Sequence, residues 1–226
     1  MAIKANRRTA IHLGLLLICS FVFGIFSSVP VLERPDYFEQ LPDLEKQVLI
    51  AAFFQAAMAV AYVAITVLFY SILKPHSERL VTGFVAFKMI GAGFLFLGIG
   101  FLPLLVEISQ SAASATHVNE VIFERNVEWL RQGRDFVNHI GMILPWSIGS
   151  LILYYCLFIN GWVPRWLAVW GIIGSACTLA ATLILLANKI TVTSPAYLLL
   201  NAPTAFCELV LALFLMIRGF HVYEKS

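Results

Sequence analysis

Six apolar stretches divide the chain, and each is long enough to cross a lipid bilayer as a helix. About 20 apolar residues span the hydrocarbon core at a rise of about 1.5 Å per residue. A helix is expected for each stretch because unpaired backbone amides are costly in lipid. The expected spans cover approximately residues 11–29, 48–73, 80–106, 136–159, 166–187 and 196–220.

The composition supports the same class of protein. Of the 226 residues, 60% are hydrophobic and only 12% are charged, whereas soluble domains carry about 25% charged residues. The net charge of +2 comes without a cluster of Lys or Arg, so no nucleic-acid partner is expected. We therefore expect an all-α polytopic integral membrane protein, a six-transmembrane-helix bundle that forms one membrane domain over residues 1–226. Membrane lipids are its expected surroundings.

Six spans place both termini on one side of the membrane, and the positive-inside rule predicts which side. The terminal side carries eight basic residues and two acids, whereas the opposite loops carry six basic residues and ten acids. We expect a protein of the cytoplasmic (inner) membrane with both termini in the cytoplasm. The eight basic residues are Lys4, Arg7, Arg8, Lys74, Arg79, Arg165, Arg218 and Lys225.

The polar, amphipathic segment 107–135 separates the third and fourth spans. Glu128 and Arg131 are three residues apart, and Arg131 and Asp135 are four apart, so both pairs can form ion pairs on a helix. The segment is expected either to lie on the outer membrane surface or to run straight into the fourth span. A solvated connector and a lid or docking surface both fit this pattern.

One carboxylate, Glu208, lies at the midpoint of the last span, about 18 Å from either end at helical rise. A charge at this depth costs at least about 2.5 kcal/mol unless it is protonated, paired or facing water. Asn201 and Thr204 share its helical face. Pro203 in the same turn frees a backbone carbonyl. A polar stripe of this kind can line a pocket or dock one helix on another.

Lys88 is the candidate partner of Glu208. It lies about 12 Å into the third span at helical rise, a depth from which lysine can reach inward or snorkel to the interface. A Lys88–Glu208 pair is the favoured hypothesis. It would act as a polar latch if the bundle is closed, and as a ligand or proton site if it borders a cavity.

A second polar group, Asp135, Asn138 and His139, lies near the outer end of the fourth span. The four-residue spacing would let the Asp135 carboxylate orient the His139 ring. One His and one Asp make an incomplete metal site, so no metal site is expected. No cofactor is assigned, and a hydrogen-bonded polar cap at the water boundary is the simpler interpretation.

Two stretches in the second half resemble a known family. The first is Val163–Gly171, which follows a short turn, and the second is Pro203 with Glu208 followed by Leu213–Phe220. Together they resemble a large, mostly prokaryotic family of six-span membrane proteins catalogued as domain of unknown function 4386. The resemblance covers spans 4 to 6, and the first half by layout.

The resemblance implies the six-span topology and no reaction, because the family has no established activity. Its third span often carries an Arg followed by an acid three residues on. The corresponding positions here are Lys88 and Gly91. The acid is missing, so the resemblance does not extend to a charge network in this span.

The chain carries no G-x-S-x-G, H-E-x-x-H, Walker or dinucleotide motif, so nucleophilic, zinc-protease and nucleotide-binding functions lack support. Three other functions remain open. A non-enzymatic protein that binds a small lipophilic or ionisable ligand requires a cavity at Glu208. An accessory or assembly subunit, bound to other membrane subunits or to a second copy, requires a closed bundle. An integral membrane enzyme using Glu208, Asp135 or His139 as acid or base requires two polar groups converging on one space. The first is preferred, and no catalytic residue is assigned.

Overall fold

The structure is a computed structural model of the 226-residue chain. It describes residues 7–34, 36–75, 77–113 and 117–220, with the side chains of 113 and 117–120 left out. Lys4 and Lys225, which were counted for the topology, lie outside the described residues.

The described residues are almost entirely helical, and six of the helical segments are long and apolar enough to cross a membrane. The predicted all-α, six-span membrane bundle is therefore confirmed. In chain order the elements are α1 (Arg7–Phe26), η1 (Pro30–Glu33), α2 (Tyr37–Gln40), η2 (Leu41–Leu44), α3 (Glu45–Leu73), α4 (Glu78–Ala113), α5 (His117–Asp135), η3 (Phe136–Met142), α6 (Ile143–Asn160), α7 (Arg165–Leu186) and α8 (Pro195–Ile217).

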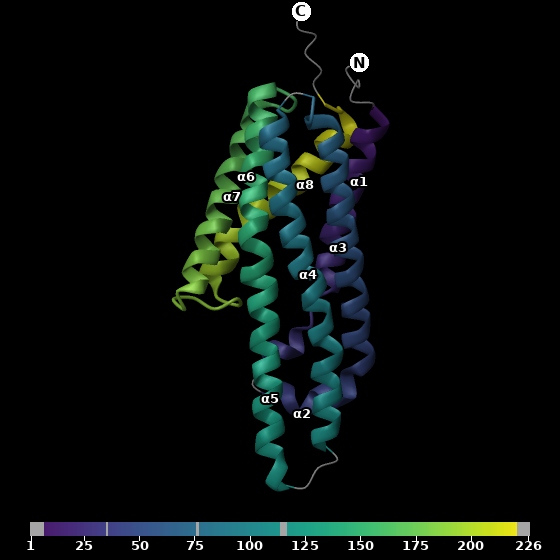
Figure 1. Cartoon of the computed structure of the whole chain (residues 1–226), viewed down its shortest axis with the longest axis vertical. Coiled ribbons are helices and arrows are strands. Elements are labelled where there is room, and N and C mark those ends of the chain that lie inside the picture. Colours follow the sequence, from purple (N-terminus) through teal and green to yellow (C-terminus); the bar gives the residue numbers. More distant parts are fainter. Residues whose placement is uncertain (1–6, 35, 76, 114–116, 221–226) are drawn as a thin grey trace, which may run out of the picture.

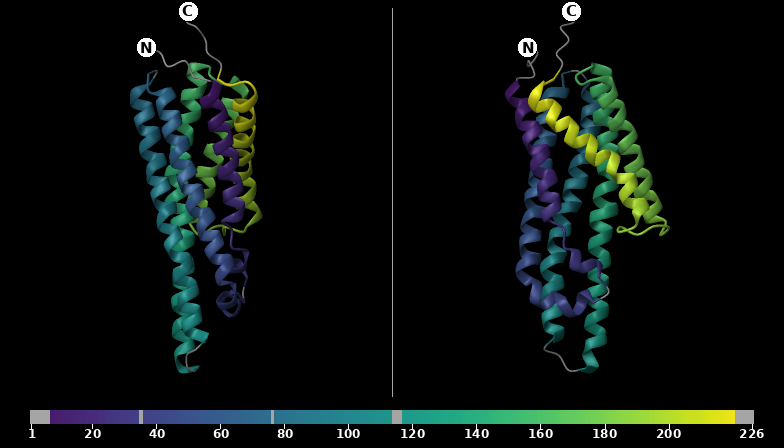
Figure 2. Two further views of the ribbon diagram at one scale, coloured as in Figure 1. Left: turned by 90° about the vertical axis from the view of Figure 1, so that its right-hand side faces the viewer. Right: turned by 180° about the vertical axis from the view of Figure 1, so that it is seen from behind.

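The spans form a ring of helices. α1 packs on α3, α3 on α4, α4 on α6, α6 on α7, α7 on α8, and α8 returns to α1. α1 begins and α8 ends at the same end of the bundle, which we call the terminal end, and the opposite end is the distal end (Figure 1). α8 is tilted, so it lies against α1 near the terminal end and diverges from it towards the distal end (Figure 2).

A tightly packed aromatic core closes the terminal end. The Phe69 ring meets the rings of Phe84 and Phe220 edge-on, each with centroids 6.3 Å apart. Trp162 packs edge-on against Phe220 at 5.9 Å. All four side chains are buried, and they belong to one cluster with leucines from α1, α6, α7 and α8. This end of the bundle is therefore filled by side chains.

Two glycines with positive φ end helices at the terminal end. Gly161 (φ 64°) follows α6 and begins the tight turn into α7 that the sequence predicts. Gly219 (φ 74°) follows α8, which ends at Ile217 instead of the predicted Phe220. Left-handed backbone of this kind is readily adopted by glycine and is a common helix terminator.

The polar segment 107–135 lengthens two spans. α4 continues to Ala113, and α5 runs through η3 into α6, so the alternative in which the segment enters the fourth span directly is confirmed. The α4–α5 hairpin extends past the loop between α7 and α8 (Figure 1). That loop shares one cavity with Asp135 and Phe136. α5 therefore lies beyond the membrane-spanning part of the ring.

The short elements η1, α2 and η2 pack against this hairpin. Leu32 and Leu41 are buried in a cluster with residues of α3, α4 and α5. The Tyr37 hydroxyl donates to Glu128 Oε2 at 2.6 Å. Both predicted ion pairs of α5 are confirmed: Arg131 contacts Glu128 at 2.8 Å and Asp135 at 3.1 Å. The hairpin and the first loop thus form one polar and apolar contact region at the distal end.

The fourth span contains one turn of π-helix, η3, immediately before α6. Pro145 follows three residues after Met142 and cannot donate a backbone hydrogen bond to the preceding turn. Its ring also crowds the carbonyl four residues earlier, and a π-helical turn relieves this conflict by widening the backbone. Because the turn is wider, the side chains that share one face differ from those that an α-helix would place together.

Acid is expected to weaken the contact between the first loop and α5 through Glu128. Hydrogen bonds from Arg131, and further ones from Tyr37 and Gln132, lower the pKa of Glu128 from 4.5 to about 2, although partial burial opposes the shift. A lowered folded-state pKa adds stability above the unfolded value, and that stability is lost as the pH falls from about 4.5 to about 2. The unfolding midpoint of the native protein should fall over this interval more steeply than that of Glu128→Gln. Glu107→Gln, an exposed change on the same hairpin, should follow the native curve; equal slopes for all three would contradict the assignment.

Candidate functional site

The predicted polar stripe of α8 faces the inside of the ring, although its members have different partners. Thr204 Oγ1 lies 2.7 Å from Thr178 Oγ1 on α7. Asn201 Nδ2 donates to the Tyr197 carbonyl at 2.8 Å, within α8. Glu208 is half-buried, and in the described part of the chain no hydrogen bond to its carboxylate is found. The carboxylate instead borders two cavities.

The first of these is a small void between Glu208 and Lys88, with a volume of about 20 Å³. Aromatic side chains of Tyr62, Trp146 and Tyr154 complete its wall. A cavity needs about 10–15 Å³ to hold one water. The void therefore has room for a single water between the two charged side chains.

Lys88 is buried, with 4% of its surface exposed, and it is held by α6. Its Nζ donates to Ser150 Oγ at 2.6 Å and lies 3.4 Å from the centroid of the Trp146 ring. Gly149 makes room for the lysine stem, because a Cβ there would lie 3.0 Å from Lys88 Cγ. The ammonium group is therefore kept inside the ring and does not snorkel.

The sequence favours a pair between Lys88 and Glu208. Both residues line the small void, so the inward alternative for Lys88 is the one observed. Among the described residues, however, direct ion pairs are formed by α5 side chains and not by these two. Lys88 and Glu208 border the same water-sized space, and the direct partners of Lys88 are a hydroxyl and an aromatic ring.

The second space is the inner cavity, of about 220 Å³, which lies between α1, α8 and the start of α6. Glu208, Asn201 and Thr204 form its wall on α8. Ser20 and Phe21 line it from α1, on the side where α1 and α8 diverge. The Glu208 carboxylate therefore faces an open pocket on one side and Lys88 on the other.

A middle cavity of about 370 Å³ lies further towards the distal end. Asn138 and His139 of the π-helical turn line it together with Gln55 and Arg134. Gln55 Nε2 donates to Asn138 Oδ1 at 3.3 Å and to the Leu95 carbonyl at 3.1 Å. This cavity and the inner cavity share the side chains of Met142 and Ile143 as a common wall.

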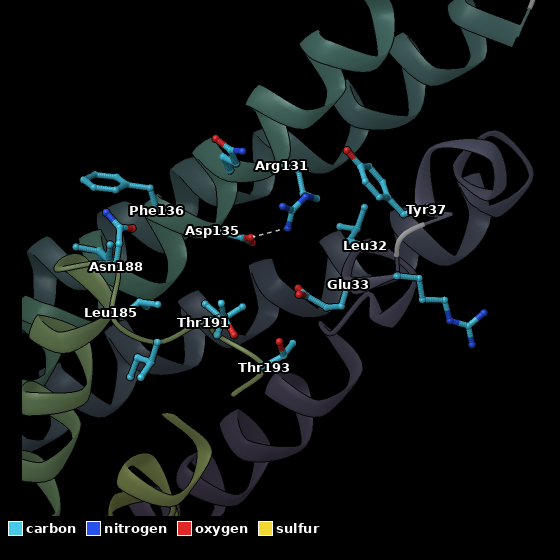
Figure 3. A pocket seen from close by; sticks show the side chains of 15 residues that line it. Leu32, Glu33, Tyr37, Arg131, Asp135, Phe136, Leu185, Asn188, Thr191 and Thr193 are labelled. Carbon is cyan, nitrogen blue, oxygen red and sulfur yellow. Dashed lines mark hydrogen bonds and ion pairs between the residues drawn. The ribbon is translucent and has the colours of Figure 1, made fainter. Parts of the chain in front are cut away.

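The distal cavity has a volume of about 660 Å³, which is larger than the volumes of the inner and middle cavities. Figure 3 shows Arg131 and Asp135 of α5 joined to one another on one wall of this cavity, with Tyr37 of α2 and Glu33 of η1 also lining it. Thr193 of the loop before α8 lines both this cavity and the middle one. Three cavities thus follow one another from the distal end to Glu208, whereas the aromatic core closes the terminal end.

The sequence family described as Domain of unknown function (DUF4386) matches residues 12–219. The chain belongs to the DUF4386 family. No curated protein and no solved structure matches it. The match covers all six spans of this DUF4386 protein, whereas the resemblance in the sequence was carried mainly by the last three.

The outer polar cluster of the DUF4386 protein divides into two environments. Asp135, which lines the distal cavity, pairs with Arg131 at 3.1 Å and with Arg134 at 3.3 Å. His139 Nδ1 lies 3.2 Å from the Tyr197 hydroxyl of α8. The expected orientation of His139 by Asp135 is therefore wrong, because the π-helical turn separates the two side chains that an α-helix would align. Asn138 and His139 do lie together on the middle cavity.

Several residues of the site were not singled out from the sequence. Ser150 and Trp146, which hold Lys88, are four residues apart on the fourth span, a spacing that places both on one face. Arg134 belongs to the polar segment 107–135, yet it is buried against the middle cavity. The helical spacing identified possible partners along one span, but only the packing of α4 on α6 brings them to Lys88.

No group of three or more His, Cys, Asp or Glu side chains that could hold a metal ion is found among the described residues.

Proposed function

We propose that this DUF4386 protein binds a small amphipathic molecule, with a basic or hydrogen-bond-donating group placed at Glu208. The observation that carries the proposal is the position of the carboxylate on the wall of the inner cavity. Lys88, the nearby cation, already contacts Ser150 and Trp146. The carboxylate thus retains free acceptor capacity in a low-dielectric setting, where a donor from a ligand would be strongly favoured.

The chemistry of the inner cavity suits a molecule with one polar and one apolar side. Asn201, Thr204 and Ser20 supply polar atoms, and Leu17 and Phe21 supply apolar surface. Its volume of about 220 Å³ is below the usual range for ligand pockets, but the middle cavity of about 370 Å³ adjoins it. Both α1 and α8 line the inner cavity, so a lipophilic molecule would enter it from the membrane between these two helices.

This function is favoured over the two alternatives by the arrangement of the polar groups. A subunit with a purely structural polar latch needs no cavity beside Glu208, and one of about 220 Å³ is found there. An acid–base enzyme needs two groups converging on one space, but His139 borders the middle cavity and Glu208 the inner one. Membrane lipids remain the proposed partners, with other subunits or a second copy as further candidates.

We propose that the protein resides in the cytoplasmic (inner) membrane with the terminal end in the cytoplasm. Basic residues gather at that end and support this orientation. The distal cavity would then open to the outer side, and the ligand would reach Glu208 from that side or from the outer leaflet. The described basic residues of the terminal end are Arg7, Arg8, Lys74, Arg79, Arg165 and Arg218.

Mass spectrometry of molecules that co-purify with the protein in native-lipid nanodiscs tests the proposal. The native protein should retain a defined small molecule, and Glu208→Gln should retain about tenfold less, because one charged hydrogen bond is worth about 1.5–3 kcal/mol. Glu107→Gln is the matched control, since Glu107 is exposed on α4 and lines none of the four cavities described above. Equal retention by both variants, or no retained molecule in the native protein, would contradict the proposal.

A further inference from the structure

We infer that the middle cavity contains a second binding site, in which Arg134 receives an anionic group of the phosphate or carboxylate type. This site does not depend on the ligand proposed beside Glu208. Arg134 is only 8% exposed, yet its Nε has no hydrogen-bond partner in the described part of the chain. Among the described residues, the hydrogen bond found for its guanidinium goes to Asp135 Oδ1, at 3.3 Å.

A guanidinium group has five N–H donors, and a buried one is expected to use most of them. Asp135 cannot satisfy Arg134 fully, because its other oxygen accepts from Arg131 at 3.1 Å. Arg131 is in turn bound to Glu128 through two further bonds. Arg134 is therefore the member of the α5 charge network with spare donors, and its planar fork matches a phosphate or carboxylate.

The wall of the middle cavity provides neutral polar groups around Arg134. Ser28, Asn138, His139 and Thr193 contribute hydroxyl, amide and imidazole groups. Two carboxylates oppose an anion here: Asp135, which contacts Arg134 at 3.3 Å, and Glu33, which lines the cavity with a solvent-exposed side chain. A bound anion would contact Arg134 inside the cavity, whereas the Glu33 side chain would remain solvated.

The depth of the cavity separates it from the site at Glu208. Gln55 lines the middle cavity, and Tyr62, seven residues later on α3, lines the void at Glu208. Seven residues of helix correspond to about 10 Å. The middle cavity lies where α1 ends and α8 begins, at the membrane boundary. Both a lipid headgroup and a free anion can reach this depth, and the chemistry at Arg134 suits either.

Thermal unfolding of the purified full-length protein tests the site with two probes. Inorganic phosphate is added to the protein in a neutral detergent, and phosphatidylglycerol replaces phosphatidylcholine in nanodiscs. We expect at least one probe to raise the unfolding midpoint of the native protein. A response to phosphate identifies a soluble anion, and a response to phosphatidylglycerol alone identifies a lipid headgroup.

Arg134→Gln should abolish the response, or raise the apparent Kd for the active probe by about tenfold. Arg125→Gln, at an exposed position on the same helix, should respond like the native protein. Thr193→Glu provides a second test on an exposed loop residue, because a carboxylate in the cavity should weaken the response without removing Arg134. Glu208→Gln should keep the response, which separates this site from the proposed function.

No response to either probe in the native protein would overturn the inference. An equal response in Arg134→Gln and Arg125→Gln would do the same. If Arg134→Gln does not fold, a Thr193→Glu response equal to the native one decides against the site.

Discussion

Replacing Lys88 with Met is expected to destabilise the protein by about 3–5 kcal/mol, the range found when one member of a buried charge pair is removed. The ammonium group is buried between Ser150 and Trp146 and faces Glu208 across a void of about 20 Å³. Without it, the Glu208 carboxylate would lose the cation that lines the same void with it. The free energy of unfolding in mixed micelles measures the loss.

The double variant Lys88→Met/Glu208→Gln separates a charge effect from a packing effect. If the two charges stabilise each other across the void, removing both should restore part of the stability lost in Lys88→Met, because neutral replacements of a buried pair are often tolerated. Lys46→Met is the matched control, since Lys46 is exposed at the start of α3. A loss in Lys88→Met no larger than that of the control would refute the role assigned to the polar centre.

The methyl group of Gly98→Ala is expected to cost about 1 kcal/mol relative to Gly100→Ala, because it displaces two hydrogen-bonded side chains that line the middle cavity. In Gly98→Ala the new Cβ would overlap Asn138 Oδ1 and lie 2.8 Å from Gln55 Nε2. The bond between these two side chains joins α3 to η3 at the middle cavity, so the substitution should break it. The unfolding free energy again provides the measurement.

The control for Gly98→Ala is the same substitution two residues later. A Cβ at Gly100 meets no atom within 4 Å. Because alanine favours a helix over glycine by about 1 kcal/mol, Gly100→Ala should be neutral or stabilising. Equal stabilities for the two variants would show that α4 and η3 are not as closely packed at Gly98 as the structure has them.

Much of the fold could be predicted because a bilayer leaves few choices. The six apolar stretches correspond to the six membrane-spanning segments, and the amphipathic segment contains both expected ion pairs. The predicted helix lengths differ more from the observed ones. The polar ends of α4 and α5 extend beyond the apolar spans, so hydropathy does not predict them.

The candidate site was only partly predictable. Glu208 and Lys88 could be identified from the sequence, because a charged residue inside an apolar span must be compensated. Their lack of direct contact could not be foreseen, since it depends on Ser150 and Trp146 of another helix. The failed alignment of Asp135 with His139 has a local cause, the π-helical turn before Pro145.

The number of spans, the helical class and the presence of a carboxylate near the membrane centre can all be read from the amino-acid sequence. These follow from hydrophobicity and from the need of every backbone amide for a partner in lipid. Only the tertiary structure decided which polar groups meet, because the rotation and tilt of each helix are set by side-chain packing around the ring. The divergence of α8 from α1 and the widened turn of η3 together place Glu208 beside a cavity.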